Sequence, residues 1–397
     1  MTDHTPAGAG HGRVVVPLVR MRARRRDEAH RAATPLELLF DLCFVVAVAQ
    51  AGARLVHAVA EGHAWEGITG YLFVFFAIYW AWVNFTWFAS AYDCDDIPYR
   101  IATLVQMSGV LVLAAGVPRA FDHADYGVAV LGYLIMRVAL TLQWLRAAHG
   151  ETGAARVAAL RFAAGLVVVQ VGWVVLLWLP DAAWTWGFLV LAAAELAVPV
   201  FAESRHETNW HPHHIAERYG LFTIIVLGET IAAATVAVQT ALDESAALDE
   251  LLPIAAGGLV IVFAAFWIYF AVPAHEYLRS NRQGFFWGYG HYLIFGSAAA
   301  IGAGIEVAVE QATHHAHIST LAASTAVTVP TALFMFTVWL VHARHFKRGT
   351  AQHLVLLVSG LLVLLAGFAG HWAVPLAGLI AACTVAVGVY LSVRAPG

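Results

Sequence analysis

The sequence predicts an all-α, polytopic membrane protein of about twelve transmembrane helices. Apolar residue types make up 60% of its 397 residues, charged residues make up only 12%, and the mean hydropathy is +0.71. Globular chains carry about a quarter charged residues, because most of their surface faces water. A helix needs roughly 20 apolar residues to cross a hydrocarbon core of ~30 Å. Stretches of about this length or more that lack Asp, Glu, Lys and Arg are 67–92, 162–180, 251–274 and 349–393, the last suited to two crossings with a turn near Gly370 and His371.

A basic segment precedes the first apolar stretch and must be distinguished from a signal peptide. The apolar stretch that follows it contains Glu37 and Asp41 and has no small-x-small cleavage site at a suitable distance. These features argue against a signal peptide. We therefore interpret residues 1–31 as a disordered, basic cytoplasmic tail. A site for lipid headgroups or for a partner is the alternative interpretation of its arginine cluster.

The distribution of basic residues agrees with twelve spans. Lys and Arg concentrate on the cytoplasmic side of membrane proteins. With the tail inside and the connections alternating, 19 of the 22 Lys and Arg residues fall in cytoplasmic segments, and only Arg119 falls in an outer loop. We therefore expect both termini in the cytoplasm. The expected spans are 36–58, 68–90, 99–117, 126–146, 158–179, 184–203, 215–238, 251–273, 288–310, 319–342, 352–370 and 373–392.

A weak internal repeat predicts two parallel halves, residues 32–205 and 206–397, each with six spans. Residues 76–82 (FAIYWAW) are similar to residues 263–269 (FAAFWIY), six spans later. Parallel repeats build transporters whose working site lies between the halves. Aromatic-rich spans can also resemble one another by chance, so this alternative stays open.

Ionisable residues inside the predicted spans are the candidate functional residues. Placing one in hydrocarbon costs at least ~2.5–3.5 kcal/mol on insertion scales and normally requires a partner. Arg137, Glu195 and Glu229 lie near the predicted bilayer midplane on three different helices, which would allow them to converge on one site. Glu37 and Asp41 lie one turn apart on the same face of the first helix, toward the cytoplasmic side.

Three more candidates lie nearer the ends of spans. Arg54 shares a face of the first helix with Gln50 and His57, toward the outside. Glu306 lies within the ninth span and His291 lies near its inner end. Embedded acids outnumber embedded bases, and a spare carboxylate in a low dielectric can bind a proton or a cation.

Two interpretations of these charges remain open. The functional one is a proton or cation relay between the halves. The structural one is a set of buried pairs, such as Arg137 with a glutamate, that only tie helices together. For Glu37 a role at the helix entry is equally possible, because residues 34–37 (TPLE) resemble a capping box with proline at the first helical position.

The sequence predicts no metal, cofactor or nucleic acid, although two groups of histidines leave metal binding open as an alternative. Two groups of histidines lack cysteines and lack helical i, i+4 spacing, and the three cysteines form no CxxC pair. No nucleophile elbow, phosphate loop or HExxH motif occurs, so an enzyme with a familiar motif is disfavoured. We expect the lipid bilayer and a small solute or ion as partners. The two groups are His206, His211, His213 and His214 on the inside, and His314, His315 and His317 on the outside.

Two long motifs resemble those of the bacterial low-temperature-requirement A proteins. Residues 33–45 (ATPLELLFDLCFV) are similar to the opening motif of that family, and residues 214–229 (HIAERYGLFTIIVLGE) to its second signature. The resemblance extends over nearly the whole chain from residue 30. It implies a polytopic protein of the bacterial cytoplasmic membrane, linked by name to growth in the cold, but no reaction or substrate. The motif positions are Glu37, Phe40, Asp41, Glu217, Arg218, Gly220, Thr223, Gly228 and Glu229.

The leading functional hypothesis is a secondary transporter of a small solute, coupled to protons or cations. In this hypothesis Asp41, Glu195 and Glu229 bind the ion and Arg137 is the counter-charge. A membrane-embedded enzyme acting on lipid is a second hypothesis, and a sensor or scaffold for cold or stress adaptation is a third. The candidate site residues are Glu37, Asp41, Arg54, Arg137, Glu195, Glu217, Arg218, Glu229 and His291.

Overall fold

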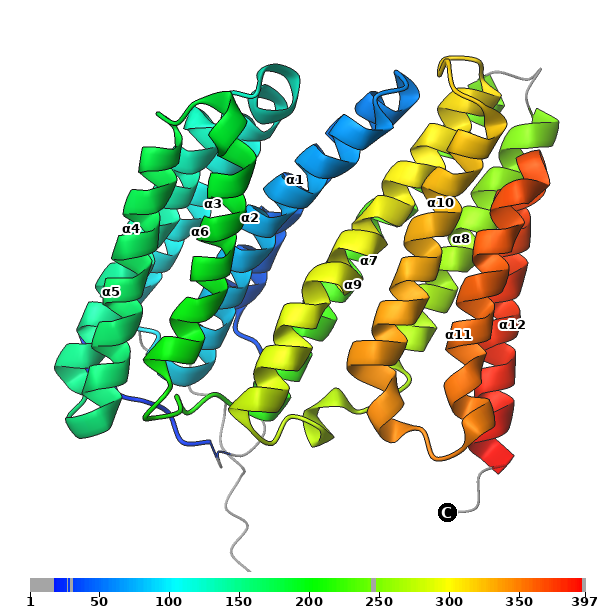
Figure 1. The fold of residues 1–397 in the computed structure, drawn as a ribbon. Coiled ribbons are helices and arrows are strands. Elements are labelled where there is room, and N and C mark those ends of the chain that lie inside the picture. The colour runs from blue at the N-terminus through cyan, green and yellow to red at the C-terminus, as the bar shows by residue number, and fades with distance from the viewer. Residues whose placement is uncertain (1–17, 27, 29–30, 244–247, 395–397) are drawn as a thin grey trace, which may run out of the picture.

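The computed structural model describes residues 18–26, 28, 31–243 and 248–394, and these form a bundle of long helices (Figure 1). Helices satisfy every backbone hydrogen bond within one segment, as a chain in hydrocarbon must. The helices are α1 (Pro35–Ala60), α2 (Ala64–Tyr92), α3 (Ile97–His123), α4 (Gly127–Gly150), α5 (Gly153–Leu176), α6 (Asp181–Ala202), α7 (Pro212–Asp243), α8 (Leu248–Phe270), α9 (Asn281–Ala312), α10 (Thr320–Thr337), α11 (Thr350–Ala366) and α12 (Ala373–Arg394).

The predicted fold class is confirmed. The described residues contain 11 stretches that are long and apolar enough to cross a membrane, the last of which is Thr350–Arg394. This last stretch comprises α11 and α12, separated by a short 3₁₀ segment in which Gly370 has a φ of 63°. Glycine adopts this left-handed conformation without steric cost, which allows the reversal expected near this residue. The count of about twelve spans therefore agrees with the structure.

The helices lie in two groups in Figure 1, α1–α6 on one side and α7–α12 on the other. The groups meet where α1 and α2 pack against α7 and α9. Neighbour pairs recur in the same order: α1 packs on α2 and α3, and α7 on α8 and α9. The similar segments nevertheless differ in setting, because Trp80 and Trp82 are buried whereas Phe263 and Trp267 are more than half exposed. The division into duplicated halves stays a prediction.

The tail is ordered where the structure describes it. We call the end of the bundle at which α1 begins and α12 ends the lower end (Figure 1). There the Arg24 N–H donates to the Ala91 carbonyl, and Met21 is buried beside Gly150. The prediction of disorder is thus wrong for residues 18–26, because these backbone contacts fix them against α2 and α4. Residues 1–17 lie outside the described part.

Candidate functional site

The first turn of α1 places two carboxylates in the interior. The predicted capping box is confirmed: the Thr34 hydroxyl accepts a hydrogen bond from the Glu37 N–H at 3.3 Å, and Glu37 Oε2 accepts one from the Thr34 N–H at 2.8 Å. This cap fixes where the helix begins and how it is rotated. Asp41 follows one turn later on the same face, and both carboxylates are completely buried.

Arg218 of α7 binds both carboxylates. Its Nη2 lies 2.6 Å from Asp41 Oδ1 and its Nε lies 3.1 Å from Asp41 Oδ2, so the two side chains form a two-point contact. Its Nη1 lies 3.1 Å from Glu37 Oε1. The indole N–H of Trp82 on α2 also donates to Asp41, at 2.7 Å. Paired two-point contacts of this kind are stronger and more directional than single hydrogen bonds.

Three more charged or ionisable side chains extend this contact. His214 Nε2 lies 3.2 Å from Glu37 Oε1, and Arg31 Nη2 lies 3.6 Å from the same oxygen. Arg31 Nη2 also donates to Asp93 Oδ2 at 2.8 Å. We call Arg31, Glu37, Asp41, Asp93, His214 and Arg218 the α1–α7 ion network. Its carboxylates exceed its guanidinium groups by one, so it carries one net negative charge while His214 is neutral.

Asp93 lies just outside the membrane-spanning part of α2. Burial raises the pKa of its carboxyl, and the positive charge of Arg31 opposes that rise. The Arg31 guanidinium additionally donates to the carbonyls of Ala89 and Ser90 at the end of α2. The tail, α1 and α2 are therefore joined to the network at the lower end.

The family follows from comparison with known proteins, since residues 32–391 match the bacterial low temperature requirement A protein (LtrA) family. The chain belongs to this family. It is also 31% identical over 229 residues to "Uncharacterized protein RA0937" of Rhizobium meliloti (strain 1021). That match covers 53% of this chain and 52% of the relative, so it spans about half the length of each. No solved structure matches the chain.

Both LtrA motifs contribute to the ion network. The opening motif supplies Glu37 and Asp41, and the second supplies His214 and Arg218. Glu217, also a motif position, faces elsewhere: its Oε1 accepts from the Ala33 N–H at 3.3 Å. The network thus unites two segments that are far apart in the chain.

Arg137 and Glu195 form a second buried pair, within the first group of helices. Arg137 Nη2 on α4 lies 3.1 Å from Glu195 Oε2 on α6, and both side chains are 2% exposed. Glu195 also accepts hydrogen bonds from Tyr133 at 2.8 Å, Trp80 at 2.9 Å and Trp173 at 3.2 Å. This environment fits a buried pair that ties helices together better than it fits an open proton or cation relay. Arg137 Nε and Nη1 nevertheless have no acceptor among the described residues.

Glu229 does not join this pair. It lies on α7, which packs against α8, α9 and α1 rather than against α4 and α6. The suggested convergence of Arg137, Glu195 and Glu229 is therefore wrong, because equal depth in the membrane does not bring helices of the two groups together.

Arg54 and His291 occupy further separate places. Arg54 Nη1 lies 3.1 Å from Asp122 Oδ2, on a cavity of ≈ 830 Å³ at the upper end that His57 also lines. His291 is buried, with Nε2 3.0 Å from the Tyr269 hydroxyl and Nδ1 2.7 Å from the Trp287 carbonyl. Neither belongs to the ion network.

No group of three or more His, Cys, Asp and Glu side chains suited to a metal ion occurs in the described part of the chain. The inner histidines are separated: His214 faces Glu37, His211 Nε2 faces the Glu28 carbonyl at 3.1 Å, and the His213 ring lies 4.8 Å from that of His275.

Sequence reasoning missed Arg31 and Asp93 as members of the network. Both lie outside the apolar stretches, where charged residues are ordinary. One signal was present, since Asp93 opens the acidic segment 93–96 (DCDD) directly after the most aromatic span. Such a segment is unusual at an end that the distribution of Lys and Arg predicts to be cytoplasmic, because basic residues normally prevail there.

Proposed function

We propose that this LtrA-family protein is a secondary transporter that moves a small solute across the bacterial cytoplasmic membrane together with protons or cations. Both termini would lie in the cytoplasm, as the distribution of Lys and Arg predicts. The observation that carries the proposal is the α1–α7 ion network, which joins the two groups of helices through buried charges.

The charge of the network favours ion coupling. It holds one more carboxylate than guanidinium, so one bound proton or monovalent cation balances the excess. Separating buried charges without a compensating ion is costly. Movement of α1 relative to α7 would therefore depend on binding or releasing a proton or a monovalent cation.

The two ends of the interface differ, as alternating access requires. At the lower end the network holds α1 to α7. Toward the upper end a cavity of ≈ 510 Å³ lies between α1, α2, α9 and α10, lined by side chains such as Leu55 and Val329. Hydrogen bonds from the Tyr71 hydroxyl to the Gly296 carbonyl and from the Tyr292 hydroxyl to the Leu72 carbonyl still join α2 to α9 beside it. A bundle held by ion pairs at one end, with a cavity toward the other, can alternate if the ion pairs are released.

The proposal is tested in liposomes that contain the full chain and an internal pH-sensitive dye. A panel of amino acids, sugars, organic anions and organic cations is applied as gradients, with buffer alone as the reference. We expect at least one solute to move protons, and His214→Gln to reduce proton movement more than solute uptake. His371→Gln, an exposed histidine at the upper end, is the matched control and should behave as wild type.

The proposal fails if no solute of the panel is taken up and none moves protons while the protein is folded and inserted in the liposomes. It also fails if His214→Gln and Glu37→Gln both give the same coupling as wild type.

A further inference from the structure

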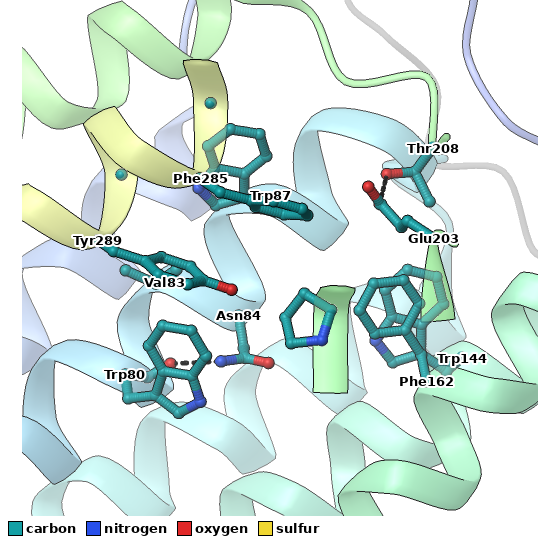
Figure 2. Close-up of a pocket in the computed structure, with 13 residues that line it drawn as sticks. Trp80, Val83, Asn84, Trp87, Trp144, Phe162, Glu203, Thr208, Phe285 and Tyr289 are labelled. Atoms are coloured by element: carbon teal, nitrogen blue, oxygen red, sulfur yellow. Dashed lines mark hydrogen bonds between the residues drawn. The ribbon is translucent and has the colours of Figure 1, made fainter. Parts of the chain in front are cut away.

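A small cavity near the lower end of the bundle is surrounded by aromatic rings (Figure 2). Trp80 and Trp87 come from α2, Trp144 from α4 and Phe162 from α5, while Phe285 and Tyr289 come from α9. We call these six side chains the aromatic cage. The cage is therefore built by both groups of helices, next to the interface that the ion network closes.

The polar atoms of three cage residues are engaged away from the cavity. Trp80 Nε1 donates to Glu195 at 2.9 Å, and Trp87 Nε1 donates to the Tyr219 hydroxyl at 3.0 Å. The Tyr289 hydroxyl donates to the Leu196 carbonyl at 3.0 Å. These residues consequently offer ring surface to the cavity rather than hydrogen-bond donors.

Glycines on α9 make room for one of these rings. A methyl group on Gly284 would lie 2.8 Å from the edge of the Trp87 ring, and one on Gly288 would lie 3.4 Å from it. The two glycines are one turn apart, so the face of α9 beside the cavity is free of side chains at both positions. The position of Trp87 in the cage depends on this gap.

One acid, Glu203, lines the cavity at the end of α6 (Figure 2). Its two carboxylate oxygens accept hydrogen bonds from the Thr208 hydroxyl and from the Asn281 amide. Among the described groups that act on its ionisation, none is a positively charged side chain. Burial raises the pKa of its carboxyl to about 7, as expected for an acid without a positive partner.

Aromatic faces with one carboxylate suit a particular ligand chemistry. Ring faces attract cations, and alkylated ammonium ions gain most because they are weakly hydrated and need no hydrogen-bond acceptors. A calcium or magnesium ion would need about six or more oxygen ligands, which the cage does not supply. The cavity measures ≈ 40 Å³, and since a water molecule needs ~10–15 Å³ on this measure, it holds a small ion only.

We propose that the aromatic cage and Glu203 bind a small alkylated ammonium ion. The rings of the cage contact its methyl groups and the Glu203 carboxylate balances its charge. As a substrate class this inference rests on the proposed transport function, but binding itself does not require transport.

The test uses tetramethylammonium chloride and the purified full-length protein in detergent, with tryptophan fluorescence as the readout at constant ionic strength. We expect saturable quenching by tetramethylammonium, and affinity for ammonium about tenfold weaker or more, because ammonium is strongly hydrated. Glu203→Gln should weaken tetramethylammonium binding about tenfold or more by removing the charge. Glu207→Gln removes a charge from an exposed side chain four residues on, and should leave binding unchanged.

A second variant keeps the test decisive if Glu203→Gln does not fold. Phe162 stacks on Trp144 with ring centroids 4.1 Å apart, so Phe162→Leu removes one wall without removing a tryptophan. The inference is overturned by any of three results. These are no saturable quenching by tetramethylammonium, equal affinity for ammonium, or wild-type affinity for tetramethylammonium in folded Glu203→Gln or Phe162→Leu.

Failure of this inference is distinguishable from failure of the transport proposal. Saturable binding without solute-driven proton movement would leave the cage and refute transport. Proton-coupled uptake of another solute, without binding of tetramethylammonium, would support the transport proposal and refute binding at the aromatic cage.

Discussion

Loss of the Arg218 charge should destabilise the protein more than any single surface substitution. In Arg218→Gln, Asp41 loses contacts of 2.6 and 3.1 Å and Glu37 loses one of 3.1 Å, while both carboxylates stay completely buried. Removing one partner of a buried ion pair costs about 3–5 kcal/mol, because the remaining charge is left without compensation. The loss of unfolding free energy should therefore fall in this range.

Neutralising the acid should restore much of that stability. In the double variant Arg218→Gln with Asp41→Asn, two amides can hydrogen-bond where two charges stood, so we expect at least half of the lost free energy to return. Arg100→Gln is the matched control: the Arg100–Asp95 pair has a similar length, 2.9 Å, but is partly exposed. Exposed pairs contribute about 0–1 kcal/mol.

The free energy of unfolding is measured by titrating the detergent-solubilised proteins with sodium dodecyl sulfate and following tryptophan fluorescence. The reasoning is refuted if Arg218→Gln loses no more stability than Arg100→Gln. It is equally refuted if Asp41→Asn fails to recover any stability in the Arg218→Gln background, since the cost would then not come from the unpaired carboxylate.

Three further predictions use the same unfolding measurement. The Glu203 carboxyl has a pKa of about 7 in the folded protein and 4.5 ordinarily. Between these two pH values the folded state binds more protons than the unfolded state. The free energy of unfolding should therefore fall as pH rises from about 4.5 to 7, by up to roughly 3 kcal/mol. Glu203→Gln should remove this slope, and an unchanged slope would assign it to other groups. A methyl group on Gly304 would lie 2.1 Å from the carbonyl oxygen of Ala326 on α10, so Gly304→Ala should lower the free energy of unfolding by about 1–3 kcal/mol. Gly388 has open space around it, so the control Gly388→Ala should lose no stability. Equal stabilities of the two variants would contradict the close approach of α9 and α10. Gly370→Ala forces alanine into a φ of 63° and should cost about 1–2 kcal/mol, and a neutral effect would show that the reversal between α11 and α12 does not need this conformation.

The sequence by itself determined the membrane class, the approximate number of spans and several local features. Charge-free stretches of about 20 residues suffice to determine the membrane class and the approximate number of spans, because the thickness of the hydrocarbon core sets the length of a crossing helix. The capping box at Thr34 and Glu37 and the reversal at Gly370 depend on neighbouring residues alone, so local chemistry was enough to predict them. Both LtrA motifs were likewise visible as short, continuous segments.

Only the tertiary structure decided which buried charges meet. Asp41 and Arg218 are 177 positions apart, and their contact depends on how α1 and α7 are rotated and where they approach. The predicted spans put Arg137, Glu195 and Glu229 at the same depth, yet only the first two are partners, because α4 and α6 belong to one group of helices and α7 to the other. The aromatic cage is a still more distant assembly, since α2, α4, α5 and α9 each supply part of it. Periodicity along one helix indicates which faces are buried, but the partner of each face depends on packing between helices.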